Sequence, residues 1–258
     1  MLDITRAGPV TTLRMAHGKA SAFDLDFLRA LREALADQAA DDGVRAVVLT
    51  GTGTIFSAGV DLRRLLDGGR PYIERFVPEL EDCATDLLAF GKPLVAAING
   101  HAIAGGCMLA CACDARLLAA DSSSPGRGAR LGMPELKVGV PFPSAVLETV
   151  RQAVPPQTFH ALVLRGVLYG PAESLAHGLV DELVPPSELL PRALAVAHEL
   201  AAMPPLSFAE TKRLVREPVL QRLRTAGPPR RAWLIDAWSS DGILAAVRRY
   251  VEATLGAR

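Results

Sequence analysis

The chain has 258 residues, of which 50% are hydrophobic, and it carries 28 basic and 28 acidic side chains. Such a chain can form one large domain or a core with a small appendage, and its zero formal charge argues against nucleic acid or an anionic membrane as the main partner. The sequence has no signal-peptide pattern at its N-terminus and no apolar run near the ~18 residues of a membrane helix, so we expect a cytoplasmic protein.

Strands alternate with helices in the first half of the chain. Two short strands are predicted over 2–6 and 10–15, and Asp24 is a suitable N-cap for a helix that ends near Ala40. The apolar run at 44–50 predicts a buried strand. Further along, we expect a short helix from Val60, an amphipathic helix over 71–90, strands over 94–98 and 114–119, and an exposed turn over 121–129.

The second half is predicted to be mainly helical. Helices are expected over 144–154, 156–165 and 171–177, then one strand over 179–184. From residue 186 onward we expect only helices, broken by prolines near 204–205, 218 and 228–229. This order indicates an α/β core over 1–190 and a helical C-terminal region over 191–258. The C-terminal helices either pack on the chain's own core or serve as a lid or a subunit contact, and the sequence does not separate these alternatives.

Residues 99–141 contain the features that most suggest chemistry. A helix is expected to begin with Ala104, Gly105 and Gly106, directly after a buried strand and a turn. Because this first turn has almost no side chains, its backbone N–H groups are open at the positive end of the helix dipole and can hold an oxygen that gains negative charge. Glu135 lies among apolar residues. A shielded carboxylate and such donors suit proton abstraction next to a carbonyl, with the enolate held in an oxyanion hole.

Other motifs fit less well. The loop 51–59 lacks the third glycine of a dinucleotide fingerprint and the lysine of a phosphate-binding loop, and Ser57 does not lie in a G-x-S-x-G pattern. Cys107, Cys111 and Cys113 crowd one apolar segment, so we expect buried thiols and neither a disulfide framework nor a metal site. His101 is expected to be a surface or hydrogen-bonding residue and not a catalytic base.

The chain resembles the enoyl-CoA hydratase/isomerase (crotonase) superfamily. Seven segments carry the resemblance in family order, at 19–24, 47–51, 56–62, 92–106, 113–114, 133–139 and 176–180. The resemblance implies a spiral ββα core with a helical C-terminal domain, assembled as a homotrimer or as a hexamer of two trimers. It also implies an acyl-CoA thioester substrate, so that coenzyme A is part of the substrate and no separate cofactor is expected.

The family's binding residues can be placed on this sequence. Its two oxyanion-hole N–H groups fall on Val60 and Gly105. The segments that hold the adenine and pantetheine parts of coenzyme A match Lys19, Ala20 and Ala22 in one loop, and Ala58, Asp61 and Leu62 in the other. Ala104 replaces the first glycine of the usual Gly-Gly-Gly, which should be tolerable because the donor is Gly105.

The catalytic acids depart from the hydratase pattern. One of the two hydratase glutamates matches Glu135, but the other falls on Met108, which cannot transfer protons. A single carboxylate is enough to move a C3–C4 double bond to C2–C3, and a Pro-Phe after the glutamate helix, at 141–142, resembles the turn of Δ3,Δ2-enoyl-CoA isomerases. We therefore expect an isomerase with Met108 lining an apolar acyl pocket. The alternatives are a hydratase or another crotonase reaction with an acid from the 71–90 helix (Glu74, Glu79 or Asp82), and a non-catalytic acyl-CoA-binding protein.

Overall fold

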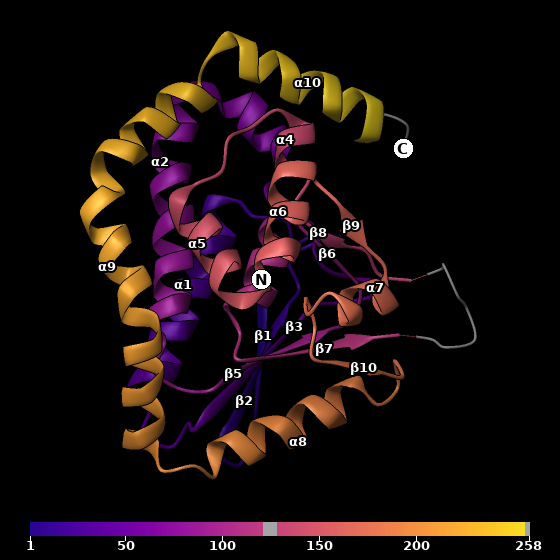
Figure 1. The fold of residues 1–258 in the computed structure, drawn as a ribbon, viewed down its shortest axis with the longest axis vertical. Helices are drawn as coiled ribbons and strands as arrows, with labels where there is room; N and C mark the ends of the chain where they lie inside the picture. The colour runs from indigo at the N-terminus through magenta and orange to yellow at the C-terminus, as the bar shows by residue number, and fades with distance from the viewer. Residues whose placement is uncertain (121–127, 256–258) are drawn as a thin grey trace.

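The larger of two β-sheets runs through the centre of the protein (Figure 1). The computed structural model describes residues 1–120 and 128–255. In this sheet the strand order is β1 (Leu2–Ala7), β2 (Val10–Met15), β3 (Ala46–Thr50), β5 (Leu94–Ile98), β7 (Ala115–Ala119) and β10 (Glu182–Val184). β1 and β2 pair antiparallel, and the other neighbours pair parallel. β3 and β5 are buried along their whole length, as their apolar runs predict.

A smaller sheet contains β4 (Ile55–Ser57), β6 (His101–Ile103), β8 (Leu131–Gly132) and β9 (Leu168–Tyr169). Each long strand β3, β5 and β7 is followed by a short strand of this second sheet and then by a helix: α2 (Leu62–Ala89), α3 (Gly105–Ala112) and α4 (Glu135–Val138). The chain thus repeats a ββα unit three times, which confirms the expected ββα core.

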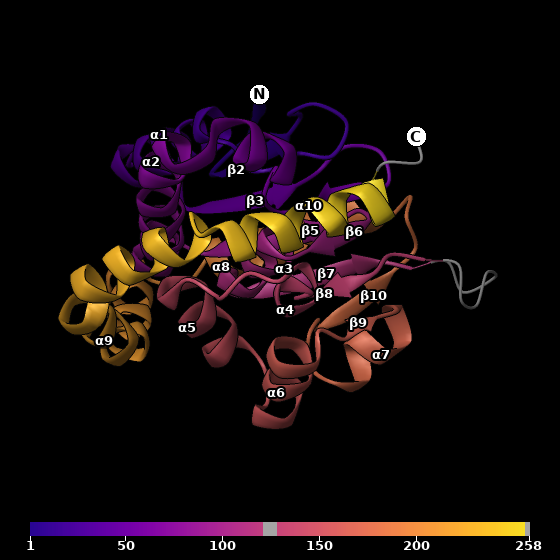
Figure 2. The ribbon, with the colours of Figure 1, turned by 90° about the horizontal axis from the view of Figure 1, so that it is seen from above.

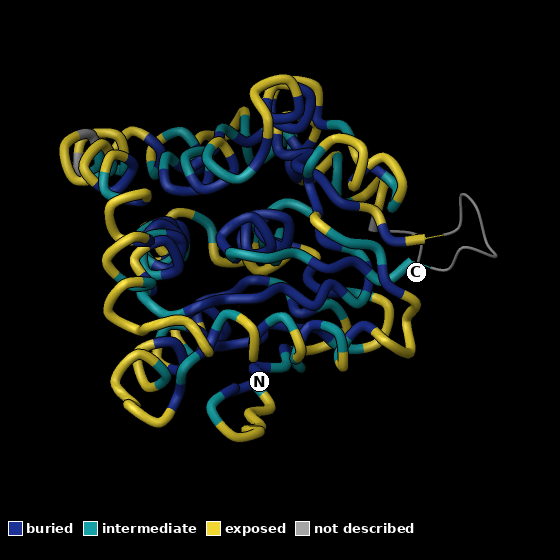
Figure 3. Tube along the Cα trace, turned by 60° about the horizontal axis from the view of Figure 1, so that its bottom comes forward, coloured by how far each residue is buried: buried dark blue, intermediate teal, exposed yellow. Residues whose placement is uncertain are grey.

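Helices cover both faces of the larger sheet. α8 (Leu189–Ala201) packs its alanines against strand residues such as Val48 and Val95, and together they form a separate apolar cluster. The main core lies on the opposite face, under α1 (Leu25–Ala40), α2 and α3. Figure 3 shows mostly buried, dark-blue chain at the centre of the molecule, enclosed by segments whose outer sides are yellow. Between α4 and α8 the chain forms α5 (Ser144–Ala153), which packs against α2 and α3, and then α6 (Pro156–Arg165) and α7 (Pro171–Ala176).

Two long C-terminal helices complete the described chain. α9 (Pro205–Trp238) runs beside α2, and α10 (Asp241–Leu255) crosses over α2 and α4 (Figure 2). The expected boundary at 190/191 falls inside α8. None of the helices in 1–120 and 128–255 is long and apolar enough to cross a membrane.

Several element predictions were wrong in detail. α9 continues through Pro218 and the 228–229 pair, where breaks were expected; only the break at 204–205 is present. The short helix from Val60 and the 71–90 helix form one element, α2, with a kink at Gly69, whose φ is 52°. The predicted strand over 179–184 is only three residues long. Most of the expected turn at 121–129 lies outside the described residues.

Candidate active site

The first turn of α3 is packed too tightly for side chains. A Cβ on Gly105 would lie 2.4 Å from the Phe23 ring, and one on Gly106 would lie 2.2 Å from the Ser57 carbonyl oxygen. No side chain caps α3, and its N-cap Ala104 has φ 53° and ψ −119°. The N–H of Gly105, the first residue of the helix, has no partner within the helix and is available to a ligand.

A second backbone donor lies beside the first. Phe23 and Val60 form a parallel bridge, in which the Phe23 N–H donates to the Gly59 carbonyl and the Asp61 N–H donates to the Phe23 carbonyl. Because Phe23 uses the groups on either side of Val60, the N–H of Val60 itself is directed away from Phe23. A Cβ on Gly59 would lie 2.8 Å from the Gly105 nitrogen, so the two loops are in close contact.

Both donors open on one cavity of about 390 Å³, lined mainly by apolar side chains. Its walls come from the two loops, α2, α4, α5 and the C-terminal helices. The lining residues are Ala20, Ala22, Ala58, Val60, Asp61, Leu62, Arg63, Leu80, Ile103, Ala104, Gly105, Pro134, Glu135, Val138, Val140, Pro143, Val146, Trp238 and Tyr250. Its size and apolar walls are typical of a small-molecule site.

Among the titratable residues that line this cavity, Glu135 is the one whose pKa is shifted most by burial. Its side chain begins α4, and the residue is 9% exposed. Burial among apolar groups raises the pKa of Glu135 to about 8, because the carboxylate loses its hydration. Its Oε2 accepts no hydrogen bond from the described residues. A carboxyl group whose pKa lies near neutrality can both take and return a proton.

A family model described as Enoyl-CoA hydratase/isomerase matches residues 6–254. The chain belongs to the enoyl-CoA hydratase/isomerase family. A putative enoyl-CoA hydratase of Thermus thermophilus is 41% identical over 189 residues, 72% of this chain and 71% of that protein. A carnitinyl-CoA dehydratase of Salmonella arizonae is 33% identical over 216 residues, 83% of this chain and 80% of that protein. The crystal structure of human mitochondrial Δ3,Δ2-enoyl-CoA isomerase matches with a TM-score of 0.92 and 25% identity, covering 99% of this chain and 98% of that chain.

Most residues that the family resemblance singled out meet in the cavity. Glu135, Val60 and Gly105 line it, and so do Ala20, Ala22, Ala58, Asp61 and Leu62. Lys19 is exposed on the same loop but is not among the lining residues. Met108 is fully buried in the core, one turn beyond Gly105, and it does not line the cavity either. Its expected place in the acyl pocket therefore remains a prediction.

The acids considered for hydration lie elsewhere. Glu74 pairs with Arg70, Glu79 with Arg32, and Asp82 with Arg231. α2 does reach the cavity, but through Leu62, Arg63 and Leu80 and not through these acids. To take part in hydration, one of these three acids would have to leave its arginine partner and turn its carboxylate into the cavity.

The structure adds two aromatic residues that sequence reasoning did not place. Trp238, at the end of α9, and Tyr250, on α10, line the cavity. The Trp238 indole N–H donates to the carbonyl of Pro141 at 2.9 Å, which ties the C-terminal helices to the turn after Glu135. The apolar residues around Trp238 in the sequence were the available signal, but the partner of its indole lies 97 residues away.

The cysteines and His101 lie outside the cavity and are buried or hydrogen-bonded to the backbone. Cys107, Cys111 and Cys113 are buried free thiols, and in the described residues no cluster of three His, Cys, Asp or Glu side chains could hold a metal ion. The Nδ1 of His101, the first residue of β6, accepts the N–H of Arg130, which directly precedes β8.

Proposed function

We propose that the protein is a Δ3,Δ2-enoyl-CoA isomerase with Glu135 as its one acid/base. The observation that carries this proposal is a single shielded carboxyl group beside two open backbone donors. Among the described lining residues the other acid is Asp61, and its carboxylate accepts the N–H groups of Arg63 and Arg64 at the start of α2. Met108, at the family's second glutamate position, cannot transfer a proton.

The proposed reaction moves a double bond with one base. Ionised Glu135 takes a proton from C2 of a 3-enoyl thioester, and the electron pair of that C–H bond enters a dienolate. The N–H groups of Val60 and Gly105 donate to the thioester oxygen, where negative charge develops; loss of one such donor costs about 2.7–4 kcal/mol in other enzymes. Protonated Glu135 then returns the proton to C4, so the double bond moves from C3–C4 to C2–C3 and the atoms balance.

We also propose how the substrate is held. The small side chains Ala20, Ala22 and Ala58 leave room for the coenzyme A part of an acyl-CoA thioester, with Asp61 and Leu62 beside it. Exposed Lys19 is suited to the charged end of that group. Coenzyme A enters as part of the substrate, and no separate cofactor is proposed. The assembly that we propose, from the family resemblance, is a homotrimer or a hexamer, which sedimentation equilibrium distinguishes from a monomer.

A hydratase is the second candidate, because relatives similar in sequence include a putative enoyl-CoA hydratase and a carnitinyl-CoA dehydratase. Addition of water to a 2-enoyl thioester then needs an acid or water site in addition to Glu135. A hydration rate on crotonyl-CoA comparable to the isomerase rate favours this candidate.

One assay panel tests these proposals. Wild-type protein should convert 3-hexenoyl-CoA to the conjugated thioester, seen as rising absorbance. Glu135→Gln should lower this rate by about 10²–10⁴-fold, because general acid–base catalysis contributes that much. Glu188→Gln, the same change at an exposed site on the chain, is the matched control. Full activity of Glu135→Gln contradicts the isomerase mechanism, and tight binding of CoA esters without any turnover indicates a non-catalytic homologue.

A further inference from the structure

A second cavity lies at the opposite end of α3 from Gly105. It has a volume of about 460 Å³ and is bounded by the C-terminal end of α3, the end of α5 and the inner side of α9. Its polar lining residues include Asp114, Arg116, Gln152, Lys212 and Arg216. None of these residues lines the cavity with Glu135, so this is a separate site.

The charges around this second cavity do not balance. The side chains of Arg116, Lys212 and Arg216 are only 11%, 6% and 10% exposed. Asp114 is the one acid among the described lining residues, and it is shared by Lys212 at 2.6 Å and Arg216 at 3.4 Å. Arg116 is neutralised by Asp181. Two buried cations thus share one carboxylate, which leaves an excess positive charge beside the cavity; buried cations normally require full compensation.

The hydrogen bonds show the same shortfall. Lys212 donates to the Lys92 carbonyl and to Asp114, which uses two of its three N–H groups. Arg216 donates only from Nη2 among the described contacts, at 3.4 Å to Asp114 and 3.5 Å to the Ala112 carbonyl, out of five N–H groups. The Nε2 of Gln152 is buried and has no partner among the described residues. Donors without acceptors therefore lie beside this cavity on both α5 and α9.

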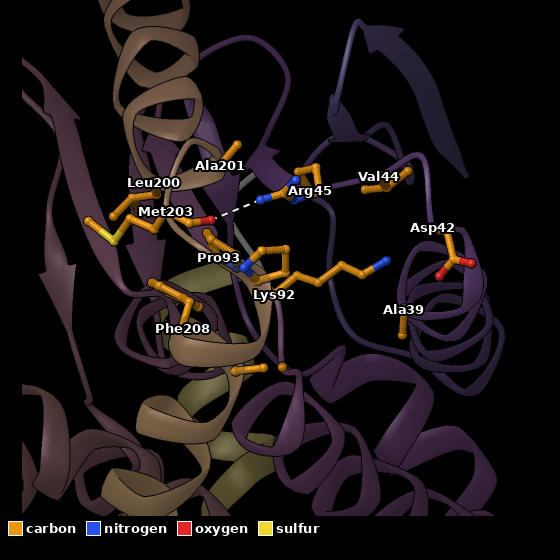
Figure 4. A pocket seen from close by; sticks show the side chains of 13 residues that line it. Ala39, Asp42, Val44, Arg45, Lys92, Pro93, Leu200, Ala201, Met203 and Phe208 are labelled. Atoms are coloured by element: carbon orange, nitrogen blue, oxygen red, sulfur yellow. Dashed lines mark hydrogen bonds between the residues drawn. The ribbon is translucent and has the colours of Figure 1, made fainter.

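A neighbouring cavity also contains two cations, but these remain partly exposed. It shares Leu200 and Phe208 with the second cavity and is lined by Arg45 and Lys92 (Figure 4). Arg45 donates to the Met203 carbonyl, and Lys92 donates to the carbonyls of Gln38 and Asp41 at the end of α1. Because Arg45 and Lys92 are only partly buried, water can satisfy their remaining N–H groups, and this neighbouring cavity does not need a ligand.

We propose that the second cavity binds a small oxyanion of the phosphate class, held by Arg216, Lys212 and the amide of Gln152. A tetrahedral oxyanion supplies several acceptor oxygens and the missing negative charge, and charge-assisted hydrogen bonds of this kind are about twice as strong as neutral ones. Burial lowers the pKa of Lys212, as expected where a cation lacks sufficient negative charge, and a bound anion should raise it again. The apolar wall formed by Leu200, Phe208 and Val215 leaves room for a small organic group on the anion.

The test is a titration of the whole protein with inorganic phosphate at constant ionic strength, followed by calorimetry and by the thermal midpoint. Wild type should bind phosphate and melt at a higher temperature. Arg216→Gln should weaken binding about tenfold or more, since it removes a charge-assisted partner. The matched control is Arg213→Gln, on the same helix, because Arg213 is exposed and pairs with Glu210. A parallel titration with glycerol 3-phosphate distinguishes free phosphate from a phosphate monoester.

Gln152→Glu provides a second measurement if Arg216→Gln fails to fold. The change keeps the shape of the side chain and puts a carboxylate into the cavity beside the cations. This variant should melt at a higher temperature than wild type without phosphate and should no longer respond to added phosphate. The proposal is overturned if all variants respond equally or if wild type shows no response at millimolar phosphate. It is also overturned if Arg216→Gln changes only the oligomeric state, because a partner chain then fills the cavity.

Discussion

Glu135 determines how the proposed isomerase should respond to pH. The carboxyl group must be ionised to take the first proton, and burial raises its pKa to about 8. We therefore expect kcat/KM for 3-hexenoyl-CoA to rise about tenfold per pH unit from pH 6 toward 8 and to level off above it. Initial rates over this range, with stability checked at each pH, measure the profile. A flat profile between pH 6 and 8 contradicts the assignment of Glu135 as the base.

Ala104 is a strained residue beside the oxyanion hole. Its φ of 53° and ψ of −119° belong to a region that glycine adopts readily and alanine does not. Ala104→Gly should raise the free energy of unfolding by about 1 kcal/mol, because relief of the strain outweighs the extra flexibility of the unfolded chain. Ala110→Gly, inside α3, should lower the free energy of unfolding by a similar amount. Denaturant melts of both variants measure this, and a loss of stability in Ala104→Gly would contradict the strain.

Single residues could be predicted where a local pattern fixes their surroundings. Glu135, Val60 and Gly105 stand out in the sequence because each belongs to a short motif, and the structure brings all three to one cavity. Trp238 and Tyr250 could not be assigned to the site, because their position depends on how α9 and α10 pack over α4 and α2. The same holds for the buried cations of α9, which are paired with a residue about a hundred positions away.

The C-terminal helices contribute the far wall of the cavity through Trp238. This side chain is 2% exposed, packs against Phe76 and is fixed by its bond to the Pro141 carbonyl. Trp238→Leu should lengthen the cavity and raise the kcat/KM ratio of 3-dodecenoyl-CoA to 3-hexenoyl-CoA by about tenfold. Trp238→Phe, which keeps most of the ring volume, should change the ratio much less. Rates on both thioesters measure the ratio, and an unchanged ratio in Trp238→Leu would exclude this wall from the acyl site.

Helices and strands were predicted well where the apolar pattern extends over many residues, and poorly where the element is only two or three residues long. β3, β5 and α1 have clear patterns, whereas β4, β6, β8 and β9 contain only two or three residues each. The break predicted at Pro218 is absent from α9. A helix that packs along α2 can lose one backbone hydrogen bond at a proline and still continue. The smaller sheet was not predicted, because the pairing of its short strands depends on tertiary contacts.

The order of elements along the whole chain is informative because each ββα unit is local in sequence. Three such units place β4, β6 and β8 side by side, and their loops present Val60, Gly105 and Glu135 to one cavity. This arrangement keeps a carboxyl group away from water, and the fold must tolerate its charge. Activity and stability are therefore expected to oppose each other at Glu135.

The stability of the whole molecule should show this opposition as a pH dependence. Since the pKa of Glu135 rises from 4.5 in the unfolded chain to about 8 in the folded one, the native state holds a proton that the unfolded state releases between these values. Wild-type stability should therefore fall relative to Glu135→Gln as pH rises from 4.5 to 8, by at most about 5 kcal/mol. Denaturant melts of both proteins at each pH cancel the contribution of every other group. Parallel stability curves would mean that Glu135 ionises freely, and they would remove the physical basis for its role as a shielded base.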